Sequence, residues 1–376
     1  MKLEDIGRKL GILEFNYPKK FLWAIFLITL LMIPGLLQMK IEPSLEKVLP
    51  QNLEVLKKMN YMRDQFGADM VYTIVDIKDS SFTDIRDPLI LKQVEATNSK
   101  ISHEKNILFV NSITDMVRDY NNDVIPEDYE KVKEIFEQAK KMNDPRLSLT
   151  NQDYSILITE VKTNTGSSAA DIKQVVKDIR YDLDTTNQLE LAVGLTGYNA
   201  LDKATFEVIL NDFSYTTLLS FLFIAIVVYI TFKTLIKGMI PMVLVMVSLL
   251  WTNGTVGYLQ IPMTVASMGA AAMVMGLGID FGIHLISFFK EMRDEGKSIK
   301  EAMILTLEKD IRAVVGTSLT TMAGFASLWF SALPAMSDLG TILLIGIFYS
   351  MLVALVGLMP LLYFYEKKQE EKLSMN

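Results

Sequence analysis

Several apolar stretches, each long enough to cross a lipid bilayer as a helix, restrict the fold of this chain more than any other feature. A hydrocarbon core of about 30 Å is crossed by about 20 residues of α-helix. The bilayer offers no hydrogen-bond partner to an open backbone, so only helices and closed barrels span it. Such stretches occupy residues 21–37, 213–232, 238–258, 263–289, 313–333 and 339–365. The sequence therefore predicts an α-helical membrane protein with six transmembrane helices.

A long polar segment, residues 38–212, separates the first apolar stretch from the other five. Segments rich in β-branched residues alternate in it with helical patterns, which predicts an α/β domain of the split βαβ, ferredoxin-like type. The expected strands are 70–77, 107–113, 154–161 and 189–195, and the expected helices are 88–101, 126–142 and 168–185. Ser168 and Asp171 predict a capping box at the start of the last helix. A further helix is expected to run from about Asn199 into the second apolar stretch.

The distribution of Lys and Arg predicts which side of the membrane each part occupies. Basic residues gather in the leader 1–20, in the tail 366–376 and in the connections after the second and fourth apolar stretches. By the positive-inside rule, both termini are then cytoplasmic and the domain 38–212 is extracytoplasmic, in a multi-pass protein of the cell membrane. Two amphipathic segments, 3–15 and 291–311, are either helices at the cytoplasmic interface or ordinary connectors.

Composition argues against several classes of function. The net charge of −7 does not suit nucleic-acid binding, which requires a basic surface. The chain has no cysteine and few histidines, so we expect no metal site built from its side chains. A Walker A motif is absent, and so few histidines leave no Ser/His/Asp arrangement. We therefore expect no catalytic residues, no enzyme activity and no cofactor beyond a coupling ion.

The fourth apolar stretch contains a single acid, Asp280. An ionised acid in hydrocarbon costs at least about 2.5–3.5 kcal/mol on insertion scales, and such residues usually mark an ion or substrate path. Gly276, Asp280 and His284 recur every four residues and share one helix face. Gly278 and Gly282 lie roughly opposite, where they permit close packing of another helix. We predict that Asp280 couples transport to H⁺ or Na⁺, with His284 as a proton relay; the alternatives are a static interhelical hydrogen bond and an interfacial anchor.

The fifth apolar stretch offers partners for Asp280. Gly316, Thr320 and Gly324 form a small, polar stripe along one helix face, with Thr321 beside it. The hydroxyls of Thr320 and Thr321 are candidates to hydrogen-bond Asp280 or to ligate a dehydrated ion. Alternatively, such hydroxyls bond their own helix backbone or merely pack helices together.

The order of one helix, a large polar domain and five further helices resembles one repeat of the resistance-nodulation-division (RND) superfamily. Residues 276–284 (GLGIDFGIH) match the fourth-helix motif of its lipid-exporting branch, which includes the MmpL and hopanoid-transporter relatives. Residues 320–328 (TTMAGFASL) look like the fifth-helix motif of that branch, and residues 193–199 (VGLTGYN) fit the segment before the second helix. On these motifs the chain is identified as a half-size, single-repeat member.

This resemblance implies a function for the chain. Asp280 would be the proton- or cation-coupling acid, and residues 38–212 would be a porter domain for a hydrophobic or amphiphilic, lipid-like cargo. The sequence departs from the MmpL pattern at Phe281, because that group commonly has a tyrosine after the acid. Since the chain supplies only one repeat, the resemblance implies a homodimer or a partner half-transporter.

Two other interpretations stay open. Sterol-sensing relatives share the same helical bundle, so the chain would then be a lipid sensor that does not transport. A SecD/SecF-like secretion accessory also has six spans and an outer domain, but its Gly-x-Asp-Phe motif lies before the outer domain rather than in the fourth span. Only a transporter requires an Asp280 that titrates or binds an ion during turnover.

Overall fold

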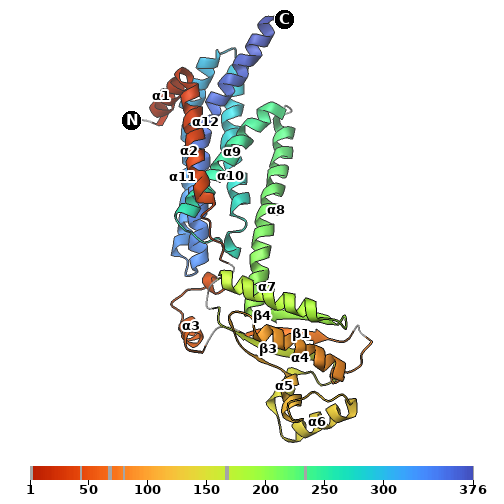
Figure 1. Cartoon of the computed structure of the whole chain (residues 1–376). Helices are drawn as coiled ribbons and strands as arrows, with labels where there is room; N and C mark the ends of the chain where they lie inside the picture. Colours follow the sequence, from red (N-terminus) through yellow and green to blue (C-terminus); the bar gives the residue numbers. More distant parts are fainter. Residues whose placement is uncertain are drawn as a thin grey trace. The chain divides into compact units, whose positions relative to one another are not determined.

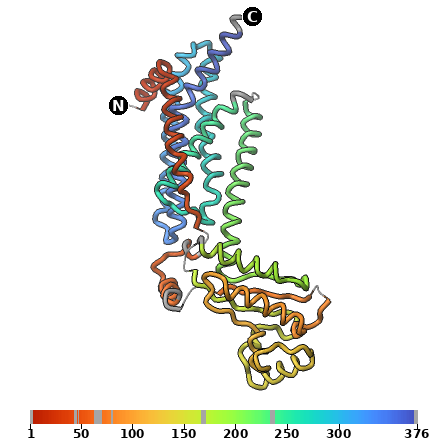
Figure 2. Tube along the Cα trace, in the orientation of Figure 1, coloured from red at the N-terminus to blue at the C-terminus, as the bar shows by residue number. Residues whose placement is uncertain are grey.

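The computed structural model describes residues 3–42, 45–66, 70–78, 81–165, 169–232 and 235–375. Its contacts divide the chain into two compact units. Unit 1 comprises Met1–Pro50 and Val208–Asn376, and unit 2 comprises Gln51–Glu207. Unit 1 is a bundle of long helices, and unit 2 is a sheet with helices packed on it (Figures 1 and 2).

Among the described residues, six long apolar helices confirm the predicted transmembrane stretches. They are α2 (Pro18–Leu36), α8 (Tyr198–Phe232), α9 (Leu235–Tyr258), α10 (Ala270–Asp294), α11 (Ile299–Ala326) and α12 (Pro334–Met375). Each is apolar enough and long enough to cross a membrane. α8 is one continuous helix from Tyr198, which confirms the expected run from about Asn199 into the second stretch.

The core of the bundle lies among α9, α10, α11 and α12. Its fully shielded side chains include Trp251, Leu285, Leu307, Val353 and Leu358. α2 packs on α9, where Trp251 Nε1 donates a hydrogen bond of 2.9 Å to the hydroxyl of Thr29. Both of these polar side chains thus find a partner inside the bundle, which lipid would not provide. Short 3₁₀ helices follow α2 and α11 and precede α10: η1 (Leu45–Val48), η4 (Ser327–Phe330) and η3 (Val265–Ser267).

Residues 291–311, expected to be either an interfacial amphipathic helix or an ordinary connector, do not form a helix of their own. α10 ends and α11 begins within this range. Gly296 has a φ of +82°, a conformation that follows helix ends, and Ser298 caps α11 through a capping box with Glu301. Residues 293–298 (RDEGKS) contain no apolar side chain, and Ser298 and Glu301 have the spacing of a capping box, so the break had a signal in the sequence. The first half of α11 therefore belongs to the same helix as the fifth apolar stretch.

The other amphipathic segment forms α1 (Leu3–Asn16), which packs on α11 and α12. A Cβ on Gly11 would lie 2.9 Å from Ile304 Cα, so the backbones of α1 and α11 are close. Glu14, one turn further along, is fully buried, and neither carboxylate oxygen has a hydrogen-bond partner among the described residues. Burial raises the pKa of Glu14 well above its ordinary value.

Unit 2 is built on an antiparallel sheet of β1 (Met70–Asp76), β2 (Ile107–Asn111), β3 (Ile156–Thr163) and β4 (Ala192–Gly197). The strands lie in the order β2-β3-β1-β4. β3 and β4 both pair with β1, and β2 pairs with β3. A strand is thus inserted between β1 and β2, which α4 connects, and this is a split βαβ arrangement. The predicted strands are present, with shifted ends.

The helices α4 (Pro88–Ser102) and α7 (Ala169–Thr186) pack on the sheet, and they correspond to two of the predicted helices. Their shared core with β1 and β3 includes Val71, Ile101, Val161, Val175 and Ile179. Between β2 and β3 lie α5 (Ile113–Asp119), the predicted helix α6 (Tyr129–Lys141) and η2 (Pro145–Leu149), and α3 (Glu54–Phe66) precedes β1. Ser168, the predicted cap of α7, lies outside the described residues.

The motif at residues 193–199 has a structural role in unit 2. Most of it forms β4, and Asn199 lies in the first turn of α8. The Asn199 side chain is buried, and its Nδ2 donates hydrogen bonds to the hydroxyls of Thr163 at 2.9 Å and Thr165 at 3.3 Å. These bonds fasten the first turn of α8 to the end of β3.

The buried Glu14 predicts how stability depends on pH. Because burial raises its pKa, the folded chain holds this proton to higher pH than the unfolded chain. Its contribution to stability is therefore full below the ordinary glutamate pKa of about 4.3 and is lost as pH rises toward the raised pKa. Glu14→Gln cannot ionise, so we expect its melting temperature to exceed that of the wild type at neutral pH, by about 2–4 °C per kcal/mol relieved.

Thermal unfolding in detergent across a pH series measures this difference. Glu4→Gln is the matched control, because Glu4 lies on the exposed side of the same helix. The control variant should follow the wild-type curve, and Glu14→Gln should lose part of the pH dependence. Identical curves for all proteins would contradict a charge cost at Glu14.

Candidate functional site

The helix α10 presents two contrasting faces. Gly276, Asp280 and His284 are exposed along one side of it, as their spacing predicts. Gly278 and Gly282 are buried on another side. A Cβ on Gly278 would lie 2.6 Å from the hydroxyl oxygen of Ser350 in α12, and one on Gly282 would lie 2.6 Å from Pro241 Cβ in α9. The buried glycines therefore hold α10 close to the bundle.

The neighbouring helix α11, which packs on α10, also has exposed small and polar residues. Gly316, Thr317, Thr320 and Gly324 are exposed on it. A Cβ added to Gly276, Gly316 or Gly324 would meet nothing within 4 Å. We call this surface the α10–α11 face, defined by residues 276, 280, 284, 316, 317, 320 and 324. The predicted packing glycines thus divide into two that pack within the chain and three on this open face.

The hydroxyls of α11 bond to their own helix. Thr320 Oγ1 donates to the carbonyl oxygens of Gly316 at 3.1 Å and Thr317 at 2.9 Å, and Thr321 Oγ1 donates to Thr317 at 2.9 Å. This is the alternative that the sequence left open for these threonines. The single chain therefore does not bring either hydroxyl to Asp280 as a donor, although their oxygen lone pairs can still accept or ligate.

Asp280 makes no hydrogen bond or ion pair with any residue that the structure describes. Its side chain is exposed on a helix that is apolar enough to cross a membrane. A carboxylate in this position would face hydrocarbon, where an ionised acid without a partner is unfavourable. Binding of a proton or cation, or cover by another helix, would remove that cost.

The structure adds one residue that the sequence analysis did not select. Asp310 of α11 interacts electrostatically with His284 of α10, and its Oδ2 is buried without a hydrogen-bond partner among the described residues. Asp310 lies among other charged residues in the segment EKDIR, where nothing in the sequence distinguished it from a solvated acid. His284 thus lies one turn from Asp280 along α10 and faces Asp310 across the helix pair.

A second feature of the bundle is an apolar hollow of about 430 Å³ between α8 and α9. Its lining is almost wholly apolar and includes Phe221, Val228, Met239, Met242, Met246 and Leu250. Methionine side chains are flexible and adapt to apolar ligands of varied shape. The hollow can therefore accept a hydrocarbon chain, and Tyr229 is the residue of its lining that carries a hydroxyl group.

Two half-buried charges of unit 2, Asp84 and Arg86, are paired with each other. Arg86 Nε donates hydrogen bonds of 2.9 Å to both carboxylate oxygens of Asp84, and the hydroxyl of Tyr129 donates to Asp84 at 2.7 Å. Burial acts to raise the pKa of Asp84, but these hydrogen bonds outweigh it and the pKa falls below its ordinary value. Such a satisfied cluster fits a structural role. Across the described part of the chain, no group of three His, Cys, Asp or Glu side chains is arranged to hold a metal.

Comparisons with known proteins agree on the kind of protein. The model of the MMPL family matches residues 50–366. A membrane protein of Methanocaldococcus jannaschii is 30% identical to this chain over 376 residues, which cover 98% of this chain and 96% of that protein. The family match includes both the α10 and the α11 motifs.

The two glycine faces of α10 predict that the same substitution destabilises the chain on one face and has little effect on the other. Gly278→Val would force a side chain against Ser350, so we expect destabilisation of about 1–3 kcal/mol from overpacking. Gly276→Val meets open space within the single chain and should leave the melting temperature of the monomer nearly unchanged. Thermal unfolding of both variants at the same detergent concentration measures the difference. Equal losses would show that helix propensity rather than packing sets the cost.

Proposed function

Because the chain belongs to the MMPL family of membrane proteins, whose role is transport rather than enzyme catalysis, we propose that it is an ion-coupled secondary transporter. Its cargo is hydrophobic or amphiphilic and lipid-like, and its energy source is the proton-motive force or a sodium gradient. Both termini lie in the cytoplasm, unit 2 lies on the outer side of the cell membrane, and export is the direction of transport.

The observation that carries this proposal is the exposed, unpartnered Asp280 in the apolar helix α10. An acid in this environment is held only if it changes its state during function or is covered by a partner. Alternation between an ion-bound and an empty carboxylate supplies a charge change deep in the membrane. Such a change favours one arrangement of the helices over another, which is the requirement for coupling.

His284 and Asp310 extend Asp280 into a line of ionisable groups. His284 is one helical turn from Asp280, about 6 Å along the axis, and Asp310 interacts with His284 from α11. This line leads toward the end of α10 where Arg293 pairs with Glu366 and Glu370 of α12. We assign His284 and Asp310 the transfer of the ion between Asp280 and the cytoplasm.

The α10–α11 face is covered by a second copy of the chain in this proposal. Small residues dominate the face, and small residues permit close approach of membrane helices. A two-fold axis along the membrane normal would place the Asp280 of each copy near that of its partner and away from lipid. A separate half-transporter of similar surface is the alternative occupant.

The hollow between α8 and α9 supports the lipid-like cargo. Its lining is almost wholly apolar and comes from two membrane helices, so a hydrocarbon chain from the surrounding bilayer can enter it directly. The same hollow would serve a lipid sensor that does not transport. Ion coupling at Asp280 distinguishes the two functions.

Asp280→Asn tests the coupling. The protein is reconstituted in vesicles that contain a fluorescent NBD-labelled phospholipid, and dithionite quenching follows its movement between leaflets under an imposed H⁺ or Na⁺ gradient. We expect the gradient-dependent rate to fall to that of protein-free vesicles, because an amide neither ionises nor releases a proton. The melting temperature should be unchanged, since Asp280 has no partner to lose among the described residues.

Asp294→Asn is the matched control, because Asp294 is exposed at the end of the same helix. It should retain the gradient-dependent rate. Undiminished movement in Asp280→Asn would exclude coupling at this residue. Gradient-independent binding of the NBD lipid in both variants, without movement in the wild type, would favour the sensor.

Disulfide cross-linking tests the second copy. The chain contains no cysteine, so single cysteines introduced at Gly276, Gly316 and Gly324 report only on these positions. We expect oxidation in membranes to give a covalent dimer from at least one of them, because Cα atoms near a two-fold axis lie within about 7 Å. Leu30→Cys, on the 55% exposed Leu30 of α2, should stay monomeric. A dimer from Leu30→Cys alone would place the interface elsewhere.

A further inference from the structure

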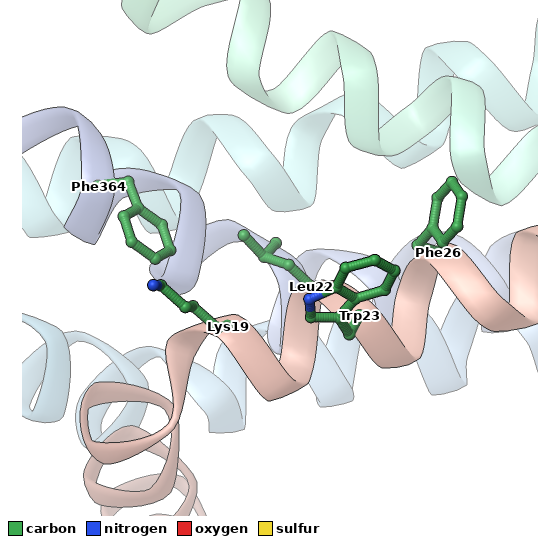
Figure 3. A pocket seen from close by; sticks show the side chains of 5 residues that line it. All are labelled: Lys19, Leu22, Trp23, Phe26 and Phe364. Atoms are coloured by element: carbon green, nitrogen blue, oxygen red, sulfur yellow. The ribbon is translucent and has the colours of Figure 1, made fainter.

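A second hollow in the bundle, of about 360 Å³, lies between α2 and α12. It is lined by Lys19, Leu22, Trp23 and Phe26 of α2 and by Phe364 of α12 (Figure 3). The nitrogen of Lys19 lies beside the ring of Phe364, and Leu22, Trp23 and Phe26 follow along α2 (Figure 3). One end of the hollow therefore carries a positive charge, and the rest is apolar.

The spacing of the α2 residues produces this arrangement. Positions 19, 22, 23 and 26 follow the i, i+3, i+4, i+7 pattern and lie on one helix face. Trp23 and Phe26 pack edge to face with ring centroids 5.6 Å apart, yet they are 62% and 54% exposed. The apolar wall runs about 10 Å along the helix from Lys19. Such a wall on a membrane helix fits a hydrocarbon chain.

The ammonium group of Lys19 makes no ion pair or hydrogen bond with the residues that the structure describes. Its neighbour Lys20 differs, because the Lys20 nitrogen lies 4.1 Å from the ring centroid of Tyr17. The acids near this end of α12 are also engaged: Glu366 and Glu370 pair with Arg293 at 3.5 Å and 2.6 Å. The charge of Lys19 is thus available to an anion from outside the chain.

The geometry points to a binding site for one anionic phospholipid, with its phosphate on Lys19 and an acyl chain along Leu22, Trp23 and Phe26. Lys19 is the second residue of a membrane helix, which is the level of lipid headgroups. Basic residues between membrane helices at this level bind anionic headgroups. A peptide would leave backbone groups without partners against this apolar wall. The site is distinct from the hollow between α8 and α9, to which we assigned the cargo. We therefore assign a resident lipid to the hollow between α2 and α12.

Native mass spectrometry of the full-length protein tests the site. The wild type, Lys19→Gln and Lys20→Gln are released from micelles with equal amounts of phosphatidylglycerol or phosphatidylcholine, and the retained lipid is measured. We expect Lys19→Gln to weaken phosphatidylglycerol binding about fivefold, the effect of one lysine on an anionic lipid. Lys20→Gln removes the same charge one residue away and should bind as the wild type does. Trp23→Ala should weaken the binding of both lipids, because it removes part of the wall.

Three outcomes would overturn the proposal. Equal losses in Lys19→Gln and Lys20→Gln would mean diffuse attraction to the basic end of the bundle. Equal retention of phosphatidylglycerol and phosphatidylcholine by the wild type would mean that the headgroup is not recognised. Dissociation of a dimer by Trp23→Ala, with lipid retention unchanged, would mean that a second copy fills the hollow. Each variant alters a side chain that is more than one-third exposed, and unchanged melting temperatures would exclude unfolding as the cause.

Discussion

The bundle depends on one constraint: a bilayer provides no hydrogen-bond partner to a polar group. The threonines and serines of α11 meet it by donating to carbonyl oxygens one turn back on their own helix. Trp251 meets it through Thr29 of the neighbouring helix. Asp280 has no hydrogen-bond partner among the described residues, and one buried carboxylate oxygen of Asp310 has none either. The two acids therefore differ from the threonines and serines of the same helix pair.

The glycines of α10 lie on two faces of the helix, one packed against the bundle and one exposed. Gly278 and Gly282 bring α10 against α12 and α9, so they determine where Asp280 stands. Gly276, on the same turn as Gly278, leaves open space beside the acid. The small residue beside the ionisable group permits the close approach of another helix.

Patterns with a clear period were predictable from the sequence. The strand at 70–76 alternates buried and half-buried residues, and the membrane helices are long apolar runs. The exposure of Asp280 was not predictable, because four-residue spacing gives a shared face but not what covers it. Asp310 was hidden among other charges, and its proximity to His284 arises only when α11 packs on α10. The break at Gly296 and Ser298 was predictable from the glycine and the Ser298–Glu301 capping box, but it was missed because neither signal belongs to an amphipathic pattern.

The composition of α8 has a mechanical consequence. Its 35 residues include neither proline nor glycine, whereas α2, α9 and α12 each contain a proline. A helix without such residues has no preferred point of bending, so a twist applied to its first turn is carried along the backbone. Asn199 fixes that first turn to the end of β3. A rotation of that first turn therefore displaces the end of the strand with it.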